Sequence, residues 1–220
     1  MRWKCSLLLV SAICLWGSAA TADTILFANI TNGQENPPAV PTTALGAARP
    51  ASFGVAFFTL NDAMTSLTFT ATVFNIDFTG TQTADPNDNI AAAHIHAGPL
   101  VTPATNGGVV WGFIGLPFND TNPTDTVVSP FPVGVGAMIT SKWDAPEGNN
   151  TTLAAQLTHI LNGRSYINFH TFQFPGGEIR GAILAADTAP IPEPGTMTLV
   201  GLGGAAILRS IRRRKRLEEV

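Results

Sequence analysis

The sequence predicts an all-β protein, a β-sandwich with one short helix, and two observations carry this prediction. Short runs that alternate apolar and polar residues recur along the middle of the chain, and Gly, Pro and Asn turn residues separate them. Both cysteines, Cys5 and Cys14, lie in the first apolar segment, so the body has no disulfide and depends on core burial. A single domain is expected at this length of 220 residues.

The clearest strand covers residues 64–74, where Leu67, Phe69 and Val73 fall on one face and threonines on the other. Six less regular strands are expected at 24–30, 52–60, 90–97, 108–114, 165–171 and 178–185. Residues 151–161 place leucine and isoleucine at helical spacing before Asn162-Gly163, which predicts one short helix. Residues 117–132 hold four prolines, which favours a long surface loop without fixed structure.

The amino-terminal residues 1–22 have the pattern of a secretory signal peptide. Arg2 and Lys4 precede an apolar run, and Ala20-Thr21-Ala22 supplies small residues for cleavage between Ala22 and Asp23. An uncleaved anchor helix is the alternative, but the apolar run is short for a membrane span. We therefore expect an exported body at residues 23–187.

The carboxyl-terminal residues 188–220 have three parts. Pro192-Glu193-Pro194 precedes an apolar stretch at 196–208, and a basic cluster at 209–216 follows. Prolines end a helix, an apolar stretch enters lipid, and arginines stay on the cytoplasmic side. Thirteen residues reach only about 20 Å along a helix against roughly 30 Å of hydrocarbon, which favours a transient anchor in the inner membrane.

This order of parts resembles the PEP-CTERM sorting signal of Gram-negative bacteria. The resemblance implies processing by an exosortase-type membrane protease near Pro192, Glu193 and Pro194, and export to the cell surface or an exopolysaccharide matrix. An ordinary outward-facing tail anchor is the alternative.

Charge excludes one class of partner. Between residues 23 and 187 the chain has four basic residues against 12 acidic ones, so we expect no nucleic-acid partner.

Three histidines are candidate metal ligands. His94 and His96 stand two apart in one predicted strand and therefore project from the same face, as His170 does with Tyr166 and Asn168 in another. If the two strands are neighbours, three imidazoles converge on a site for copper or zinc with an open fourth position. The alternative is histidines that are hydrogen-bonded or partly exposed without metal.

Other chemistries lack support. The sequence contains no nucleophile elbow, Walker phosphate loop or dinucleotide fingerprint, so we expect no catalytic residues and no enzyme activity. Glu178 and Arg180 are two apart in one predicted strand, which favours a surface ion pair. His159 is expected on the helix surface.

Four segments in order, at 34–38, 93–99, 161–171 and 175–181, make residues 24–186 similar to a CHRD domain, the module first described in chordin. The resemblance implies a β-rich extracellular module. In chordin the module belongs to a secreted growth-factor antagonist, but no feature of this sequence supports growth-factor binding here. Residues 78–89 and 117–132 are insertions relative to compact bacterial versions.

A weaker resemblance is to copper-zinc superoxide dismutase, also a Greek-key sandwich, so the expected fold is an immunoglobulin-like or a superoxide-dismutase-like Greek-key β-sandwich. It implies that His94, His96 and His170 bind copper and that Arg180 guides an anion. The sequence lacks a bridging histidine, a zinc cluster and a disulfide, which argues against redox cycling.

The preferred function is an exported surface or extracellular-matrix protein, a non-catalytic structural or adhesion module sorted by an exosortase. Polysaccharide is a possible partner, bound by Asn and Thr and by stacking on Trp111 or Trp143. The alternative function is a copper- or zinc-binding protein resembling superoxide dismutase.

Overall fold

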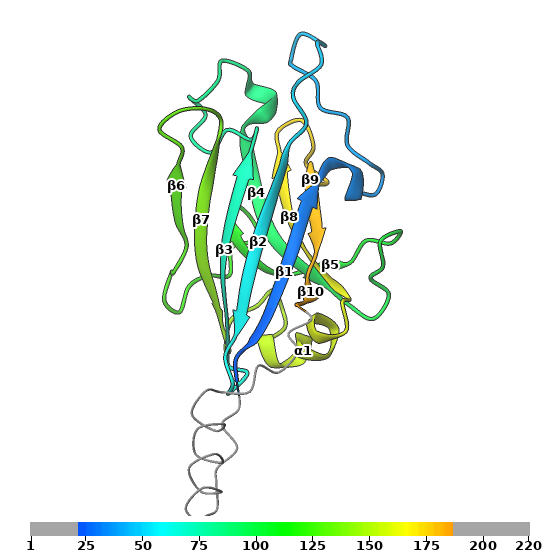
Figure 1. Cartoon of the computed structure of the whole chain (residues 1–220), viewed down its shortest axis with the longest axis vertical. Coiled ribbons are helices and arrows are strands. Elements are labelled where there is room, and N and C mark those ends of the chain that lie inside the picture. Colours follow the sequence, from blue (N-terminus) through cyan, green and yellow to red (C-terminus); the bar gives the residue numbers. More distant parts are fainter. Residues whose placement is uncertain (1–21, 187–220) are drawn as a thin grey trace, which may run out of the picture. The chain divides into compact units, whose positions relative to one another are not determined.

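The computed structural model describes residues 22–186, which form a curled antiparallel sheet with one short α-helix among them (Figure 1). The strands are β1 (Thr24–Thr31), β2 (Phe53–Leu60), β3 (Ser66–Phe74), β4 (Ile90–Ala97), β5 (Gly108–Ile114), β6 (Val127–Pro130), β7 (Gly136–Asp144), β8 (Ser165–Thr171), β9 (Ile179–Ala182) and β10 (Leu184–Ala185). The helices of the described part are α1 (Leu153–Leu161) and two 3₁₀ turns, η1 (Asn32–Gln34) and η2 (Pro86–Asp88).

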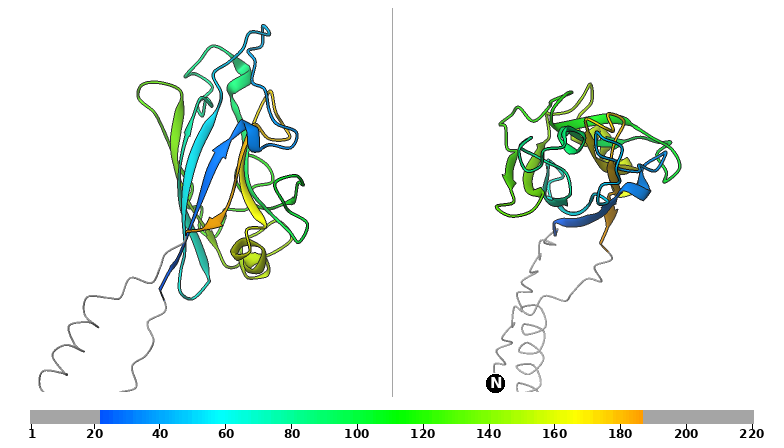
Figure 2. Two further views of the ribbon diagram at one scale, coloured as in Figure 1. Left: turned by 45° about the vertical axis from the view of Figure 1, so that its right-hand side comes forward. Right: turned by 90° about the horizontal axis from the view of Figure 1, so that it is seen from above.

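The strand order is β5-β4-β8-β9-β1-β2-β3-β7-β6. The sheet divides into two halves where β9 meets β1, because the register between these strands contains one pair, Thr31 opposite Arg180. The halves β5-β4-β8-β9 and β1-β2-β3-β7-β6 then face each other, as the side view in Figure 2 shows. This arrangement confirms the predicted all-β sandwich class.

Aromatic residues from both halves fill the space between the two inner faces. Phe69 of β3 lies 5.0 Å from Phe113 of β5, and Trp111 of β5 stacks on Trp143 of β7 at 5.7 Å between ring centroids. Both tryptophans are fully buried. The prediction that Trp111 or Trp143 stacks on polysaccharide is therefore wrong, because the core packing of the halves uses both rings.

Most predicted elements are confirmed, and the differences have physical reasons. The helix begins after Thr152, whose hydroxyl accepts a hydrogen bond from the backbone N–H of Ala155, and Gly163 follows it at φ +66°. The expected loop at 117–132 contains the whole of β6, and β7 was missed because Ser141 interrupts its inward-facing apolar residues. The strand expected at 178–185 is two strands, β9 and β10.

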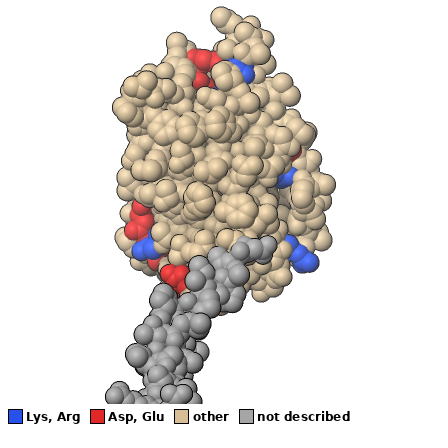
Figure 3. All heavy atoms as spheres, viewed as in Figure 1, with Lys and Arg blue, Asp and Glu red and all other residues tan. Residues whose placement is uncertain are grey.

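The two halves differ on their outer faces. Outward residues of β1, β2 and β3 are Phe, Val, Ile, Asn, Ser and Thr, and none of them is charged; Figure 3 shows this face as an expanse without charged groups. The outward face of β4, β8 and β9 carries buried polar residues, among them His94, Asn168 and Arg180. Loops cover this second face, and the candidate site lies beneath them.

Residues 1–21 of the predicted signal peptide and the whole sorting tail with its membrane segment lie outside the described residues, whereas Ala22 and Asp23, on either side of the predicted cleavage point, are described and exposed. Within residues 22–186, no helix combines the length and apolar character needed to cross a membrane.

Candidate metal site

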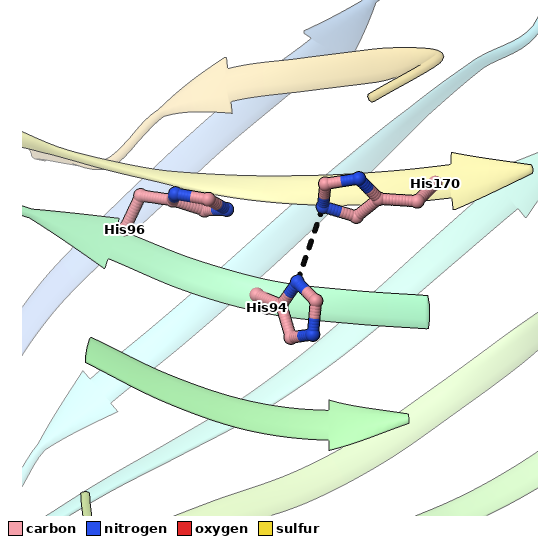
Figure 4. A group of neighbouring side chains, drawn as sticks. All are labelled: His94, His96 and His170. Atoms are coloured by element: carbon pink, nitrogen blue, oxygen red, sulfur yellow. Dashed lines mark hydrogen bonds between the residues drawn. The ribbon is translucent and has the colours of Figure 1, made fainter. Parts of the chain in front are cut away.

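The strand register brings the three predicted histidines together. β4 and β8 are neighbours, with His94 opposite Asn168 and His96 opposite Tyr166. One nitrogen from each of His94, His96 and His170 lies within 4.8 Å of the others, and all three side chains are buried. Figure 4 shows the rings of His94 and His170 turned toward one another, with His96 beside them on β4.

Each ring places its other nitrogen on a backbone carbonyl. His94 Nε2 lies 3.0 Å from the Leu116 oxygen, His96 Nδ1 lies 2.9 Å from that of Gly107, and His170 Nδ1 lies 2.9 Å from that of Pro175. A carbonyl only accepts hydrogen bonds, so each of these nitrogens carries the proton in its ring. The inward nitrogens, His94 Nδ1, His96 Nε2 and His170 Nε2, therefore carry lone pairs.

The inward nitrogens have no proton to share among them. His94 Nδ1 and His170 Nε2 lie 3.1 Å apart, and with both outer nitrogens protonated neither neutral ring can donate across this distance. His96 Nε2 is buried and has no hydrogen-bond partner among the described residues. Three lone pairs thus face one small space, an arrangement that a cation would stabilise.

A loop folded onto the edge of the sheet supplies the Leu116 carbonyl. Asn119 holds this loop on β5: its backbone N–H donates to the Gly112 oxygen, and the Gly112 N–H donates to the Asn119 side chain. Gly112 lies opposite His94 in the register. A Cβ at position 112 would stand 1.8 Å from the Pro117 oxygen and 2.9 Å from the His94 ring. Glycine is therefore required for this close approach.

Two further turns supply the other carbonyls. The N–H of Gly107 donates to the Tyr166 hydroxyl, which fixes the segment before β5 over His96. After β8 the chain turns back: the N–H groups of Thr171 and Gly177 both donate to the Phe174 oxygen, which brings Pro175 over His170. All three acceptors for the histidines thus come from loops.

Burial keeps the three rings neutral. Burial, together with a smaller effect of the neighbouring His170, lowers the pKa of His94 to about 4, and the hydrogen bond to the Leu116 carbonyl opposes this shift. Burial also lowers the pKa of His96 to about 4 and depresses the pKa of His170. Neutral imidazole is the form that binds a metal, so at neutral pH the three rings are in the protonation state that metal binding requires.

The distances suit one transition-metal ion. Metal–imidazole bonds of about 2.0–2.1 Å place two bound nitrogens roughly 3–4 Å apart. The 3.1 Å between His94 and His170 is in this range. The widest separation, 4.8 Å, requires ring shifts of about 1 Å on binding. Metal-bound histidines commonly donate their other ring N–H to a backbone carbonyl, which fixes the tautomer and the orientation of the ring.

A model of the CHRD domain family matches residues 26–183 of this chain. The chain belongs to the CHRD family. The match covers both halves of the curled sheet and all three histidines. No curated protein and no solved structure matches the chain.

A second family model, that of the PEP-CTERM protein-sorting motif, matches residues 190–214. Such signals mark exported surface proteins, and the motif implies processing by an exosortase. This CHRD protein is therefore an exosortase-sorted surface protein.

The CHRD domain adds neighbours to the site that the sequence reasoning did not assign. Tyr166 stacks on His96 at 4.7 Å with the rings nearly parallel, and the Arg180 guanidinium lies 4.8 Å from the centre of the Tyr166 ring. Asn168 stands between them in the register, opposite His94 on one side and Arg180 on the other. The alternation of side chains along the predicted strand places Tyr166 and Asn168 on the same face as His170, and this is the sequence signal that could have identified them as neighbours of the site.

Glu35 is the other neighbour that was missed. It is buried, its Oε1 has no hydrogen-bond partner among the described residues, and neither does Asn168 Oδ1. Both oxygens would lie within 2.8 Å of a Cβ at Gly177. Burial raises the pKa of Glu35 to about 7, although the positive charge of Arg180 and the N–H of Asn36 lower it. Glu35 is therefore largely protonated below neutral pH.

The expected surface pair of Glu178 and Arg180 is wrong. Both side chains are buried, and Glu178 pairs with Arg49 at 2.7 Å. Arg180 donates to the backbone oxygens of Gln34 and Pro103 and to Asn106. The pattern failed because loops cover the outer face of β9, which the sequence periodicity does not reveal. His159 is half-buried in the last turn of α1, away from the other three histidines in sequence and element.

Proposed function

We propose that the CHRD domain of this surface protein binds one copper or zinc ion through His94, His96 and His170, without catalysis. The observation that carries the proposal is the tautomer pattern: three outer nitrogens donate to carbonyls, which leaves three lone pairs in one buried space. Imidazole is a ligand that suits both copper and zinc.

Two features support a non-catalytic role. The three histidines are only 4–7% exposed, so substrate access to an ion at this site is restricted. Arg180, which the superoxide dismutase resemblance made an anion guide, is 3% exposed and donates to three protein acceptors. Its charge is therefore not presented to an incoming anion.

Elemental analysis of the exported full chain tests the metal proposal. We expect close to one copper or zinc per chain after purification without chelators, and loss of the metal in His94→Ala, His96→Ala and His170→Ala. His159→Ala is the matched control, since it removes a histidine from α1, and should retain the metal. Metal-free protein that does not take up either ion from solution contradicts the proposal.

A second candidate function, the structural or adhesion module, is favoured by the uncharged outer face of β1, β2 and β3. Phe27 and Phe57 lie opposite each other in the register, and Phe53 stacks on Phe74 at 4.9 Å. These rings are partly exposed, and threonines of β3 lie beside them. Rings with hydroxyls and no charge suit a neutral sugar chain, which stacks on aromatic faces and hydrogen-bonds to hydroxyls.

Retention on purified exopolysaccharide of the producing cells tests this second function. We expect the double variant Phe27→Ser/Phe57→Ser to lose retention. Phe172→Ser is the matched control, because Phe172 has the same 62% exposure as Phe57 but lies in the turn after β8. Equal retention of the double variant and the control would exclude this face as the binding surface.

A further inference from the structure

Building on the proposed metal site, we propose that the three histidines select monovalent copper, Cu(I), over divalent zinc. The inference rests on the charges and hydrogen-bond partners that surround the site, and it goes beyond the proposal that a metal binds there.

Among the described residues, no carboxylate forms a hydrogen bond with any of the three histidines. All three ligands are neutral imidazoles, and all three outer nitrogens donate to backbone carbonyls, those of Leu116, Gly107 and Pro175. Many zinc sites place carboxylates in one of these layers, which offsets the charge of the ion. Here the ligands and their hydrogen-bond partners are all neutral, so they do not offset the charge of a bound ion.

A positive group lies beside the site. Arg180 lies over the Tyr166 ring, and that ring stacks on His96, so a cation stands one ring beyond a ligand. Glu178 is already neutralised by Arg49 at 2.7 Å. Glu35 is buried in the same layer, and burial raises its pKa to about 7, so its carboxyl is mostly protonated below that pH. While Glu35 is protonated, a second positive charge on the metal adds to that of Arg180.

The energetic consequence favours the smaller charge. The cost of moving an ion from water into a medium of low dielectric constant rises with the square of its charge, so a dication costs about four times as much as a monocation of equal size. Anionic ligands offset part of this cost in many zinc sites. In this site the ligands that the chain supplies are three neutral nitrogens.

Coordination number acts in the same direction. Zinc in proteins takes four ligands, and the fourth is water where the protein supplies three. The histidines are 4–7% exposed, which restricts a water ligand and its exchange. Cu(I), a closed-shell ion with soft character, is stable with three nitrogen ligands in a trigonal arrangement. The same charge argument disfavours Cu(II), so bound copper stays reduced.

Competition between the protein and chromophoric chelators tests the selection. The exported full chain, freed of metal, is titrated anaerobically with Cu(I) against bicinchoninate and separately with Zn²⁺ against a zinc-binding dye. We expect one Cu(I) per chain and a dissociation constant at least 100-fold lower than that for zinc. His96→Ala should lose Cu(I) binding and His159→Ala should keep it.

The titrations distinguish failure of the Cu(I) selection from failure of the metal site itself. If zinc binds as tightly as Cu(I) or more tightly, the selection is wrong and the metal site stands. If neither ion binds to the folded chain, the proposed metal function fails together with the selection.

An added negative charge tests the cause. Asn168→Asp keeps the shape of a side chain that lies between His94 and Arg180 in the register. We expect zinc to bind at least tenfold more tightly to this variant, with a smaller change for Cu(I). Asn29→Asp, which adds the same charge to the exposed outer face of β1, is the control and should leave both affinities unchanged. An unchanged ratio of affinities in Asn168→Asp overturns the charge argument.

Discussion

The two outer faces of the curled sheet have the same alternating pattern of side chains but differ in solvent exposure. On β1, β2 and β3 the outward residues are uncharged, and they are exposed or half-buried (Figure 3). On β4, β8 and β9 the outward face includes histidine, tyrosine, asparagine and arginine, and these polar residues are buried. The face with more polar chemistry is thus the one that is shielded from water.

The side of the sheet onto which the loops fold explains the difference. β1, β2 and β3 are neighbours in the sheet, and no described loop is held across their outer face in the way that Asn119 holds the loop after β5. The loops around β4, β5 and β8 instead fold back and present carbonyls to the histidines. A polar face can be buried only where partners satisfy its hydrogen bonds, and these loops supply them.

The largest expected effect is on the buried face, at Arg180. Arg180→Met removes a buried charged group and its three hydrogen bonds, to Gln34, Pro103 and Asn106, which hold two loops over β9. We expect a loss of about 4 kcal/mol in the free energy of unfolding. Urea unfolding of this variant checks the value. Arg164→Met, at an exposed position, should change stability by under about 0.5 kcal/mol, and similar losses in both variants would contradict the contrast.

Glu35 should show the cost of burying a charge on the same face. Its pKa is raised from 4.5 to about 7, so the folded state prefers the protonated acid. The stability that this preference contributes is present below pH 4.5 and is lost as the pH rises through about 7. Glu35→Gln mimics the protonated form and should be more stable than the natural chain above pH 7, by up to about 3 kcal/mol.

Unfolding free energies measured from pH 4 to pH 8 check this prediction and contain their own control. The variant and the natural chain should be equally stable near pH 4, where the carboxyl is protonated in both states. A stability difference that does not change with pH would show that Glu35 acts through its shape and not through its charge.

Gly112 tests the close approach of the covering loop. Gly112→Ala forces the Pro117 backbone away from β5 and should cost about 2 kcal/mol of stability. It should also displace His94 and weaken metal binding. Gly108→Ala, where an added Cβ meets nothing within 4 Å, is the control and should change stability by less than about 1 kcal/mol. Unaltered metal affinity in Gly112→Ala would separate the loop from the site.

The smallest effect is expected on the exposed face. Phe57 is 62% exposed, so Phe57→Thr loses little buried area and should change the free energy of unfolding by about 0.5 kcal/mol. Thermal unfolding measures this change. A loss as large as that of Arg180→Met would show that the face is covered in the folded protein.

How far the sequence predicts the fold depends on the local pattern. The strands at 90–97, 108–114 and 165–171 match β4, β5 and β8 at both ends, because their alternation and turn residues are local signals. β7 was missed because an inward Ser141 interrupts its alternation of apolar and polar residues. The hydroxyl of that serine is hydrogen-bonded to the hydroxyl of Thr126, in the segment before β6. Only the assembled sheet shows why a polar residue is tolerated there.

The sequence by itself determined that His94 and His96 share one strand face and that His170 lies on a face with Tyr166 and Asn168, since strand geometry alternates side chains. It also carried the CHRD and sorting motifs. Tertiary structure alone decided that β4 and β8 pair and that three distant loops turn their carbonyls onto the outer nitrogens. The physical reason is that the acceptor of a histidine's N–H hydrogen bond decides which ring nitrogen keeps a free lone pair, and that acceptor belongs to another part of the chain.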